Sequence, residues 1–242
     1  MTSLSVVIPA YNEEKRLPST LAAVSGYLAG SEFRPVEILV VDDGSTDGTA
    51  ALVEGLRKRY PALRLLKNPG NRGKGYSVKH GMLEATGDWV LFSDADLSAP
   101  IDELDKLFDR VQKEGADVAI GSRALNRNLI GVHQSVFRET AGRFFNLMMR
   151  VLVGLPFWDT QCGFKLFRKR AAGEVFSRLQ LERFGFDVEA LFIARKRGFK
   201  TIEVPVRWNH VDGTKVSMFR DSLDMFLDLL RVRWNQVRGL YR

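Results

Sequence analysis

Five short apolar runs, rich in β-branched residues, recur through the first half of the chain. They are Leu4–Ile8, Val36–Val41, Leu63–Leu66, Trp89–Phe92 and Val118–Ile120. Each is separated from the next by a stretch with helical periodicity. Because continuous apolar runs of this length indicate strands buried on both faces, they are typical of parallel sheets. The alternation predicts an α/β fold, an open and mostly parallel sheet flanked by helices, with a ligand site beyond the carboxyl ends of the strands.

The second half of the chain has a different rhythm. A polar loop after Gly121 leads to a predicted helix over residues 135–153 and a strand at Phe164–Phe167. A helix over residues 187–197, a strand at Thr201–Trp208 and a long final helix follow. Since no linker, repeat or low-complexity tract interrupts the sequence, we expect a single domain over residues 1–242.

Cysteine content and hydropathy bear on location. The one cysteine, Cys162, cannot form an internal disulfide, and no signal-peptide pattern precedes Glu13 and Glu14. The strongest candidate for a membrane span, residues 144–158, is short and contains Arg150. We therefore expect a cytoplasmic chain that does not cross a bilayer. Cys162 itself is expected to be buried filler, because nothing adjacent would activate it as a nucleophile.

The net charge of +7 is unevenly distributed. Residues 1–120 carry 14 basic and 18 acidic side chains, whereas residues 121–242 carry 22 and 11. Clustered Lys and Arg favour nucleic acid, anionic lipid or a phosphorylated substrate as partner of the second half. Charge alone does not choose among these three.

Two carboxylates, Asp94 and Asp96, directly follow the strand Trp89–Phe92, with the small Ala95 between them. A carboxylate pair at the end of a strand suits Mg²⁺ or Mn²⁺, which completes its coordination with water and substrate phosphates. The alternative is that they are ordinary loop carboxylates or a cap for the following helix.

The loops after the first two strands also carry polar groups. Tyr11 and Glu13 follow the first strand, where a ring and an acid could receive a nucleobase. The second strand is followed by Asp42 and Asp43 and then by a turn-rich segment through residue 49. Within that segment Asp47 or Ser45 is expected to cap a helix. Asp42 or Asp43 is then free to bind a base or ribose.

A glycine-rich loop over residues 71–75 follows the third strand. Its glycines permit close backbone approach, and Arg72 and Lys74 could contact a phosphate or a base. The loop lacks the third glycine of a dinucleotide fingerprint and does not open the first βαβ unit, so that interpretation is weak.

Taken in order, the motifs V-V-I-P-A-Y-N-E-E, V-V-D-D-G-S-T-D-G-T and D-A-D resemble those of glycosyltransferase family 2. The resemblance implies a nucleotide-diphospho-sugar transferase fold of GT-A type and inversion at the anomeric carbon. It implies that residues 1–125 bind the nucleotide sugar, with a Mg²⁺ or Mn²⁺ ion on Asp96 and Asp94. The residues implied around the donor are Pro9, Tyr11, Glu13, Asp42, Asp43, Lys74, Asp94, Ala95 and Asp96.

Later segments extend the resemblance. They include D-T-Q-C-G-F-K-L-F from Asp159 onward, and they are similar to the polyprenyl-phosphate sugar transferases, above all the dolichyl-phosphate β-glucosyltransferases. The resemblance implies transfer of glucose from UDP-glucose to a polyprenyl phosphate at the cytoplasmic face of a membrane, with residues 126–242 binding the acceptor. Transfer of mannose from GDP-mannose is the alternative within this group. Many such relatives carry a spanning helix that this sequence lacks.

Candidate residues for the acceptor lie in the basic half. Arg123 and Lys215 are candidate clamps for the acceptor phosphate, with a surface ion pair as the alternative for each. Asp159 is expected either to orient Gln161 and the sugar or to cap a turn. A phosphate acceptor is already anionic and needs no strong base. Were the acceptor a sugar hydroxyl, Asp159 or Asp187 would be the candidate base.

Two apolar stripes at helical spacing are candidates for peripheral membrane contact. One comprises Phe145, Met148, Met149 and Leu152, and the other comprises Phe219, Leu223, Phe226, Leu227, Leu230, Trp234, Val237 and Tyr241. Arginines accompany both. The usual explanation of either stripe by itself is packing on the domain core, and membrane docking is the alternative.

Other functional classes are less well supported. A phosphohydrolase of the haloacid dehalogenase type also uses D-x-D, but after its first strand rather than its fourth. A basic nucleic-acid-binding module would fit the charge, yet no zinc, RNP or helix-turn-helix signature is present, so we expect no nucleic-acid partner. A sensor that binds nucleotide sugar without catalysis is disfavoured by the intact carboxylates. The scattered histidines His80, His133 and His210 have no metal-ligand spacing.

Overall fold

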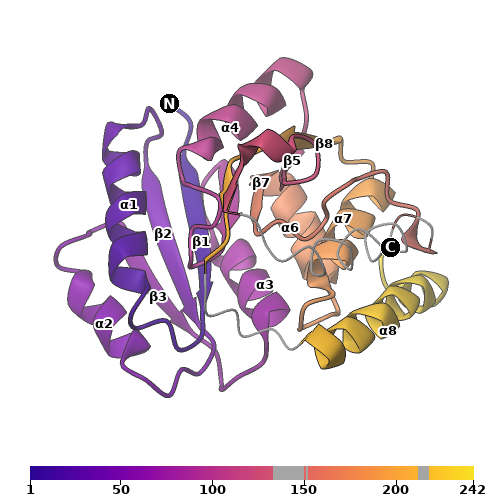
Figure 1. Cartoon of the computed structure of the whole chain (residues 1–242), viewed down its shortest axis with the longest axis horizontal. Helices are drawn as coiled ribbons and strands as arrows, with labels where there is room; N and C mark the ends of the chain where they lie inside the picture. The colour runs from indigo at the N-terminus through magenta and orange to yellow at the C-terminus, as the bar shows by residue number, and fades with distance from the viewer. Residues whose placement is uncertain (133–149, 151, 212–217) are drawn as a thin grey trace.

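The structure is a computed structural model that describes residues 1–132, 150, 152–211 and 218–242. Its centre is a seven-stranded sheet in the order β3-β2-β1-β4-β7-β5-β8 (Figure 1). The strands are β1 Leu4–Ala10, β2 Val36–Asp42, β3 Leu63–Lys67, β4 Trp89–Ser93, β5 Val118–Ser122, β7 Phe164–Arg168 and β8 Thr201–Pro205. All neighbouring pairs are parallel except those that β7 makes with β4 and β5. The predicted open, mostly parallel sheet is confirmed.

Helices cover both faces of the sheet. They are α1 Leu17–Gly30, α2 Thr49–Leu56, α3 Lys74–Glu84, α4 Glu103–Glu114, α6 Lys169–Arg178, α7 Phe186–Lys196 and α8 Met218–Val237. Successive strand residues alternate between two cores, as the strand period requires. Val6 and Ile8 of β1 pack with α1, α2 and α4, whereas Val7 packs with α3, α6 and α7. None of the helices within the described ranges combines the length and apolarity that crossing a bilayer demands.

The structure corrects the predicted strand at Thr201–Trp208. β8 ends at Pro205, which has no N–H to continue the ladder, and Arg207 turns away to form ion pairs with Asp102 and Glu103 near the start of α4. The chain then forms β9 (Trp208–Asn209), which pairs with β6 (Ile130–Val132). A short 3₁₀ helix, η1 (Arg127–Leu129), directly precedes β6.

Two predicted helices have different outcomes. The helix expected over residues 135–153 lies mostly outside the described residues, whereas the one expected over residues 187–197 is α7. α6 was not predicted, because Gly173 interrupts its buried side chains and charged residues flank them; these side chains are Ala171, Ala172, Val175 and Phe176.

Strand direction decides where loops meet. β1, β2, β4 and β5 all end at one edge of the sheet, and antiparallel β7 begins there. The polar loops that follow these four strands, and the segment that enters β7, therefore gather at that edge.

Candidate functional site

The loops after β1 and β2 are joined by backbone and side-chain hydrogen bonds. The backbone N–H of Asn12 donates to Ser45 Oγ at 2.9 Å, and that of Glu13 donates to Thr49 Oγ1 at 2.8 Å. In return, Asn12 Oδ1 accepts the N–H of Thr46 at 2.8 Å. Asn12 adopts a positive φ of 53°, which asparagine tolerates better than most residues. Asn12, to which the sequence patterns assigned no role, is one of the residues that join the two loops.

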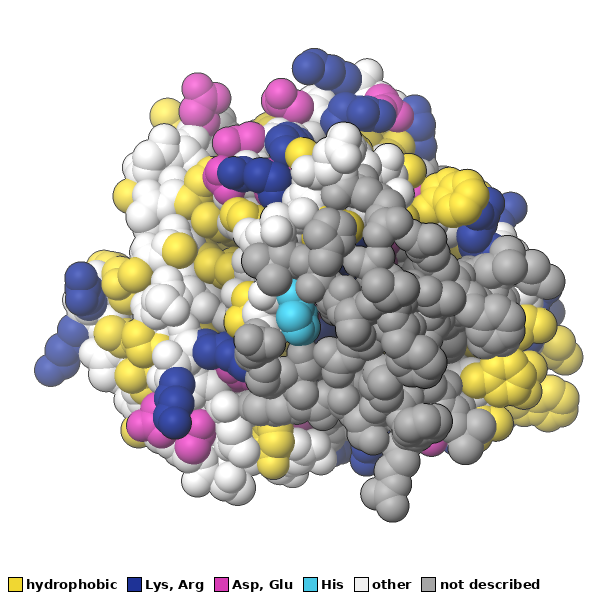
Figure 2. Space-filling view, viewed as in Figure 1, with side chains coloured by type: hydrophobic (Ala, Val, Ile, Leu, Met, Phe, Trp, Pro, Cys, Tyr) yellow, Lys and Arg dark blue, Asp and Glu magenta, His cyan; other side chains and the backbone are white. Residues whose placement is uncertain are grey.

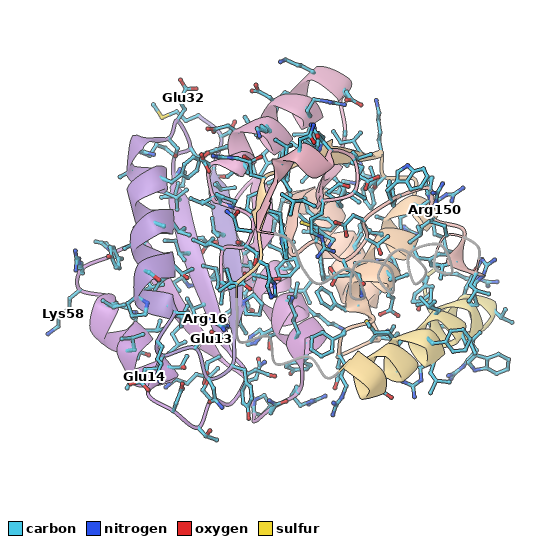
Figure 3. The ribbon with its side chains drawn as sticks, viewed as in Figure 1. Glu13, Glu14, Arg16, Glu32, Lys58 and Arg150 are labelled. Carbon is cyan, nitrogen blue, oxygen red and sulfur yellow. The ribbon has the colours of Figure 1, made fainter. Side chains whose placement is uncertain are left out.

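Pro9 and Tyr11 hold different positions at this edge. Pro9 is buried inside β1, opposite Val41 of β2, whereas Tyr11 is half-buried just beyond the strand. Glu13 forms an ion pair with Arg16 at 3.3 Å. Figure 3 shows Glu13, Glu14 and Arg16 close together near the start of α1. Tyr11 and Glu13 therefore lie just beyond the carboxyl end of β1, whereas Pro9 is enclosed within the sheet.

Asp42 and Asp43 have separate environments. Asp43 accepts the side-chain amide of Asn68 at 2.8 Å and the backbone N–H groups of Arg72 and Gly73 at 3.0 and 2.7 Å. It therefore fixes the glycine-rich loop after β3 and has little capacity left for a ligand. Asp42 accepts the N–H of Ser45 at 3.2 Å and is the better placed of the two to bind a ligand.

The prediction that Asp47 or Ser45 caps this helix is wrong, because the N-cap of α2 is Gly48 and Asp47 stands one residue earlier. Its carboxylate accepts the backbone N–H of Thr49, the first residue of α2, at 3.0 Å, while Ser45 bonds to Asn12 instead.

Lys74 connects the glycine-rich loop to the carboxylates after β4. Its Nζ lies 2.7 Å from Asp94 Oδ1. Burial alone would lower the pKa of Lys74, but the charges of Asp94, Asp187 and Asp96 raise it. Lys74 therefore stays protonated in a cluster of acids. Arg72, its neighbour, instead forms an ion pair with Glu182 at 2.5 Å and stacks over Tyr76.

Asp96 keeps one carboxylate oxygen available. Its Oδ1 accepts the N–H of Ser98 at 2.9 Å, and the second oxygen accepts no hydrogen bond from the described residues. No group of three or more metal-binding side chains is found among the described residues. A cation held by Asp96 and Asp94 would complete its coordination with water and phosphate oxygens, the arrangement that Mg²⁺ adopts at phosphate sites. The carboxylates fit such an ion.

Ala95, between the two carboxylates, is buried, and its carbonyl accepts the Thr20 hydroxyl at 2.5 Å. The next residue after Asp96, Leu97, has a positive φ of 47°. A leucine in this conformation is strained, and such strain is concentrated at functional sites. The D-A-D turn is thus held in an unusual backbone geometry.

Arg123 and Asp159 form a forked ion pair. Arg123 Nε and Nη2 lie 2.7 and 2.8 Å from the two Asp159 oxygens, and the Arg123 backbone N–H donates at 2.9 Å. Although burial raises the pKa of Asp159, the charge and hydrogen bonds of Arg123 hold the net pKa below its usual range. Asp159 is therefore a poor proton acceptor. It also accepts the backbone N–H of Gln161 at 3.3 Å, as expected of a carboxylate that caps a turn.

A small pocket connects the D-A-D turn to this second-half segment. It is lined by Ser93, Asp94, Leu97, Ser98, Ala99, Cys162, Gly163 and Trp208. Arg123 stacks over Trp208, 5.4 Å from the ring centre. Asp94 thus shares the pocket with the aromatic ring on which the forked pair rests. Burial raises the pKa of the Cys162 thiol to about 12, which agrees with its expected inert role.

A buried ion pair behind the pocket was given no structural role by the sequence analysis. Lys165 of β7 is 1% exposed and Asp187 of α7 is 5% exposed, and Lys165 Nζ contacts both Asp187 Oδ1 and the Cys162 carbonyl. Burial raises the pKa of Asp187 despite the opposing charges of Lys165 and Lys74. Asp187 had been considered only as a possible base. No sequence signal separated Lys165 from an ordinary outward-facing strand residue.

Gly163 allows the second-half segment to approach the D-A-D turn. Its carbonyl accepts the Asp94 N–H at 3.0 Å, and a Cβ placed here would lie 2.7 Å from Asp94 Oδ1 and overlap the rest of the carboxylate. Gly163→Ala should therefore displace Asp94 from Lys74 and lower kcat for the reaction expected from the sequence about tenfold to a hundredfold, since small displacements of reacting groups are costly. Steady-state kinetics on the purified variant measure this.

Gly173→Ala is the matched control, because nothing lies within 4 Å of its added methyl group in α6. It should retain full activity with equal or higher thermal stability. Equal activity of both variants would contradict the placement of Asp94 in the site.

Some expected residues lie elsewhere. Lys215, His133 and the stripe residues Phe145, Met148 and Met149 lie outside the described residues. Leu152 is partly buried against the core.

Gln161 is half-buried, and its side-chain amide lies 3.1 Å from Met225 Sδ on α8. Packing of the α8 stripe in the core was the usual explanation, yet Leu227, Leu230, Trp234 and Val237 are exposed, whereas Tyr241 is buried.

The sequence matches the model of Glycosyl transferase family 2 over residues 5–176. Dolichyl-phosphate beta-glucosyltransferases are similar over nearly the whole chain. The enzyme of Drosophila melanogaster is 39% identical over 99% of this chain and 77% of its own length, and that of Dictyostelium discoideum is 36% identical over 99% and 76%.

Solved structures share the fold at low sequence identity. Glucosyl-3-phosphoglycerate synthase from Mycobacterium tuberculosis, in complex with Mn²⁺, UDP and glucosyl-3-phosphoglycerate, superimposes with a TM-score of 0.70 and 20% identity. The alignment covers 96% of this chain and 80% of that one. The fold is thus the GT-A type expected from the sequence.

Proposed function

Because the chain belongs to glycosyltransferase family 2 and is an enzyme that transfers sugars, we propose that it moves glucose from UDP-glucose to a polyprenyl phosphate. The observation that carries the proposal is a pocket lined by both Asp94, which pairs with Lys74, and Trp208, on which Arg123 of the forked pair stacks. Family membership leaves the phosphohydrolase alternative without support.

The donor site is proposed for residues 1–125. Tyr11, Glu13 and Asp42 surround the nucleoside over Pro9, while Lys74 and the D-A-D turn meet the diphosphate. Asp43 supports this site indirectly by holding the glycine-rich loop. The similarity to dolichyl-phosphate beta-glucosyltransferases favours UDP-glucose over GDP-mannose.

Asp96, with Asp94, is proposed to hold Mg²⁺ or Mn²⁺. The cation supplies charge neutralisation for the departing diphosphate. Lys74 adds a fixed positive charge beside Asp94, so the leaving group meets cationic groups already in place.

The acceptor site is proposed for residues 126–242 together with Arg123, which stands just before them. Arg123 and Lys215 contact the acceptor phosphate, and Asp159 is a positioning residue that holds the guanidinium in its forked orientation. Gln161, whose backbone N–H donates to Asp159, is proposed to contact the sugar. The acceptor oxygen attacks the anomeric carbon opposite the diphosphate, which inverts its configuration.

No general base is required for a phosphate acceptor. Its oxygen is already anionic at neutral pH, and the lowered pKa of Asp159 makes it unsuited to accept a proton. One observation favours a second candidate, transfer to a hydroxyl: the pKa of Asp187 is raised, as in a base tuned for proton abstraction. Its enclosed ion pair with Lys165 makes this the weaker candidate.

Arg123→Lys should lower kcat/KM for the acceptor phosphate about tenfold to a hundredfold. Lysine keeps the charge but loses the two parallel hydrogen bonds to Asp159 and the stacking on Trp208. Initial rates at varied acceptor concentration, with donor saturating, measure the change. Arg168→Lys, at the exposed pair with Asp117, should leave the rate unchanged. If the two variants behave alike, Arg123 does not serve the acceptor.

We further propose peripheral contact with the cytoplasmic face of a membrane, because a polyprenyl chain is held in the bilayer. The basic second half agrees with this placement.

The donor assignment is tested by following nucleotide release with a short polyprenyl phosphate and either UDP-glucose or GDP-mannose. Each donor is assayed with Mn²⁺, with Mg²⁺ and with chelator. We expect metal-dependent release of UDP. Release of GDP alone would assign the mannosyl donor, and release unaffected by chelator would remove the metal from the proposal.

A further inference from the structure

We propose that one side of α8 is the surface on which this enzyme docks onto an anionic lipid bilayer. This docking face comprises Leu227, Leu230, Trp234 and Val237. The inference rests on the proposed function in one respect, that the acceptor's hydrocarbon chain lies in a membrane. It adds to that function the element that makes the contact and the way it is attached to the site.

The docking face is exposed along its whole length. The exposed fractions are 40% for Leu227, 48% for Leu230, 63% for Trp234 and 78% for Val237. Spacings of three and four residues place these side chains within about a quarter of the helix circumference. Figure 2 shows hydrophobic side chains gathered at the edge of the molecule over the C-terminal end of α8.

Core packing does not require this face to be apolar. The opposite side of α8 carries Leu229 and Val232, which are 1% and 0% exposed and belong to the core beneath α7. The helix thus has two apolar sides, and among the described residues only the inner side packs against the core. An outer apolar face of this kind marks an interaction surface.

Charge around the docking face favours anionic lipid. Exposed arginines lie on both of its flanks, Arg231 and Arg238 on one and Arg233 on the other. Their long side chains can reach phosphate groups while the apolar residues enter the acyl boundary, and a Trp is suited to that depth. Asp228 pairs with Arg231 at 2.8 Å and is itself buried on the inner side of the helix, whereas no ion pair with a described residue is found for Arg233 or Arg238.

A second copy of the chain fits this face less well. A two-fold interface places like arginines against one another across the axis. Four side chains on one helix are also small beside the roughly 800 Å² per partner of a stable protein interface. The bilayer meets neither difficulty.

The inner side of α8 is fixed to the site. Met225 touches Gln161, whose predicted role is in sugar transfer. Asp228 accepts a hydrogen bond from Gly185, the residue that precedes α7 and Asp187. Beyond the end of α8, the Tyr241 hydroxyl donates to Glu189 of α7. Docking of the outer face would therefore fix the distance and tilt of the site relative to the lipid surface.

The test is co-sedimentation with vesicles of phosphatidylcholine containing about a third phosphatidylglycerol, against phosphatidylcholine alone. The wild type should bind the anionic vesicles more tightly. Leu230→Ser/Trp234→Ser should weaken binding at least about tenfold. Arg233→Gln/Arg238→Gln should weaken binding to anionic vesicles about tenfold and leave neutral vesicles unaffected. Leu83→Ser, at a 40% exposed leucine on α3, is the matched control and should bind as the wild type does.

Transfer assays with two acceptors distinguish a failure of the docking face from a failure of the proposed function. The Leu230→Ser/Trp234→Ser variant should transfer sugar normally to a short, water-soluble isoprenyl phosphate and at least about tenfold more slowly to a long-chain acceptor in anionic vesicles. A wild type inactive on both acceptors would refute the proposed function, while the vesicle series would still decide the docking face.

Two results would overturn the docking face. One is vesicle binding by the Leu230→Ser/Trp234→Ser variant equal to that of the wild type. The other is a wild-type dimer, measured by light scattering, that this variant converts to a monomer without change in vesicle binding, because the face would then serve a second copy.

Discussion

Asp96→Asn is expected to lower kcat for sugar transfer by about a thousandfold or more. The substitution removes the charge of the carboxylate that is best placed to hold a divalent cation beside the leaving diphosphate, and such stabilisation contributes several kcal/mol to the reaction. The fold should persist, because an Asn oxygen can still accept the Ser98 N–H that Asp96 accepts at 2.9 Å. Steady-state transfer rates at saturating Mn²⁺, beside thermal unfolding, measure both effects.

Asp109→Asn is the control for Asp96, since Asp109 is a 70% exposed carboxylate on α4 whose loss should change neither rate nor stability. An Asp96→Asn enzyme with wild-type turnover would remove the metal role from Asp96. A variant that fails to fold would instead assign Asp96 a structural role that its hydrogen bond to Ser98 does not predict.

Lys165→Met is expected to lower the free energy of unfolding by about 3–5 kcal/mol. The substitution leaves the Asp187 carboxylate buried without its partner, which is far more costly than losing an exposed pair. The pKa of Asp187, already raised by burial, should rise further. A raised pKa means that the folded state binds the proton more tightly, so the loss should be largest at neutral pH and shrink as the pH falls through that pKa. Urea denaturation at pH 7 and pH 5 measures it.

The double variant Lys165→Met/Asp187→Asn should regain much of this loss, because it removes the stranded charge. Arg57→Met at the exposed Arg57–Glu54 pair is the control and should cost less than about 1 kcal/mol. A loss below that value for Lys165→Met would show that Asp187 is not held by Lys165.

The sheet was largely predictable because each buried parallel strand is a continuous apolar run, and the direction of β1, β2 and β4 places their loops at one edge. The insertion of antiparallel β7 between β4 and β5 was not predictable, since the periodicity of a strand carries no information on its partners. That insertion brings Gly163 against Asp94 and completes the pocket.

The division of roles between Asp42 and Asp43 also lay beyond the sequence. Both follow β2 and both are buried. Only hydrogen bonds from Asn68, Arg72 and Gly73, about 25 to 30 positions away, show that Asp43 organises a neighbouring loop. A local sequence pattern around Asp42 and Asp43 carries no information on hydrogen-bond partners so far along the chain.

Lys165 and α8 illustrate a further limit. A lysine within F-K-L-F reads as the outward side of a strand, but β7 is central and covered on both faces, so Lys165 is buried. In α8 the long apolar stripe resembles a core face. The helix ends at Val237, so Tyr241 leaves the stripe and enters the core, while Leu229 and Val232 face inward instead.

The most direct test of the central claim is to identify the atom that receives the sugar. The enzyme is incubated with UDP-glucose and Mn²⁺ and with either a polyprenyl phosphate or the corresponding polyprenol, and products are analysed by mass spectrometry and NMR. We predict glucosyl phosphate polyprenol with inverted, β configuration, and no product from the alcohol. Glucose attached to the alcohol, or no product from the phosphate despite binding of UDP-glucose, would contradict the proposed acceptor.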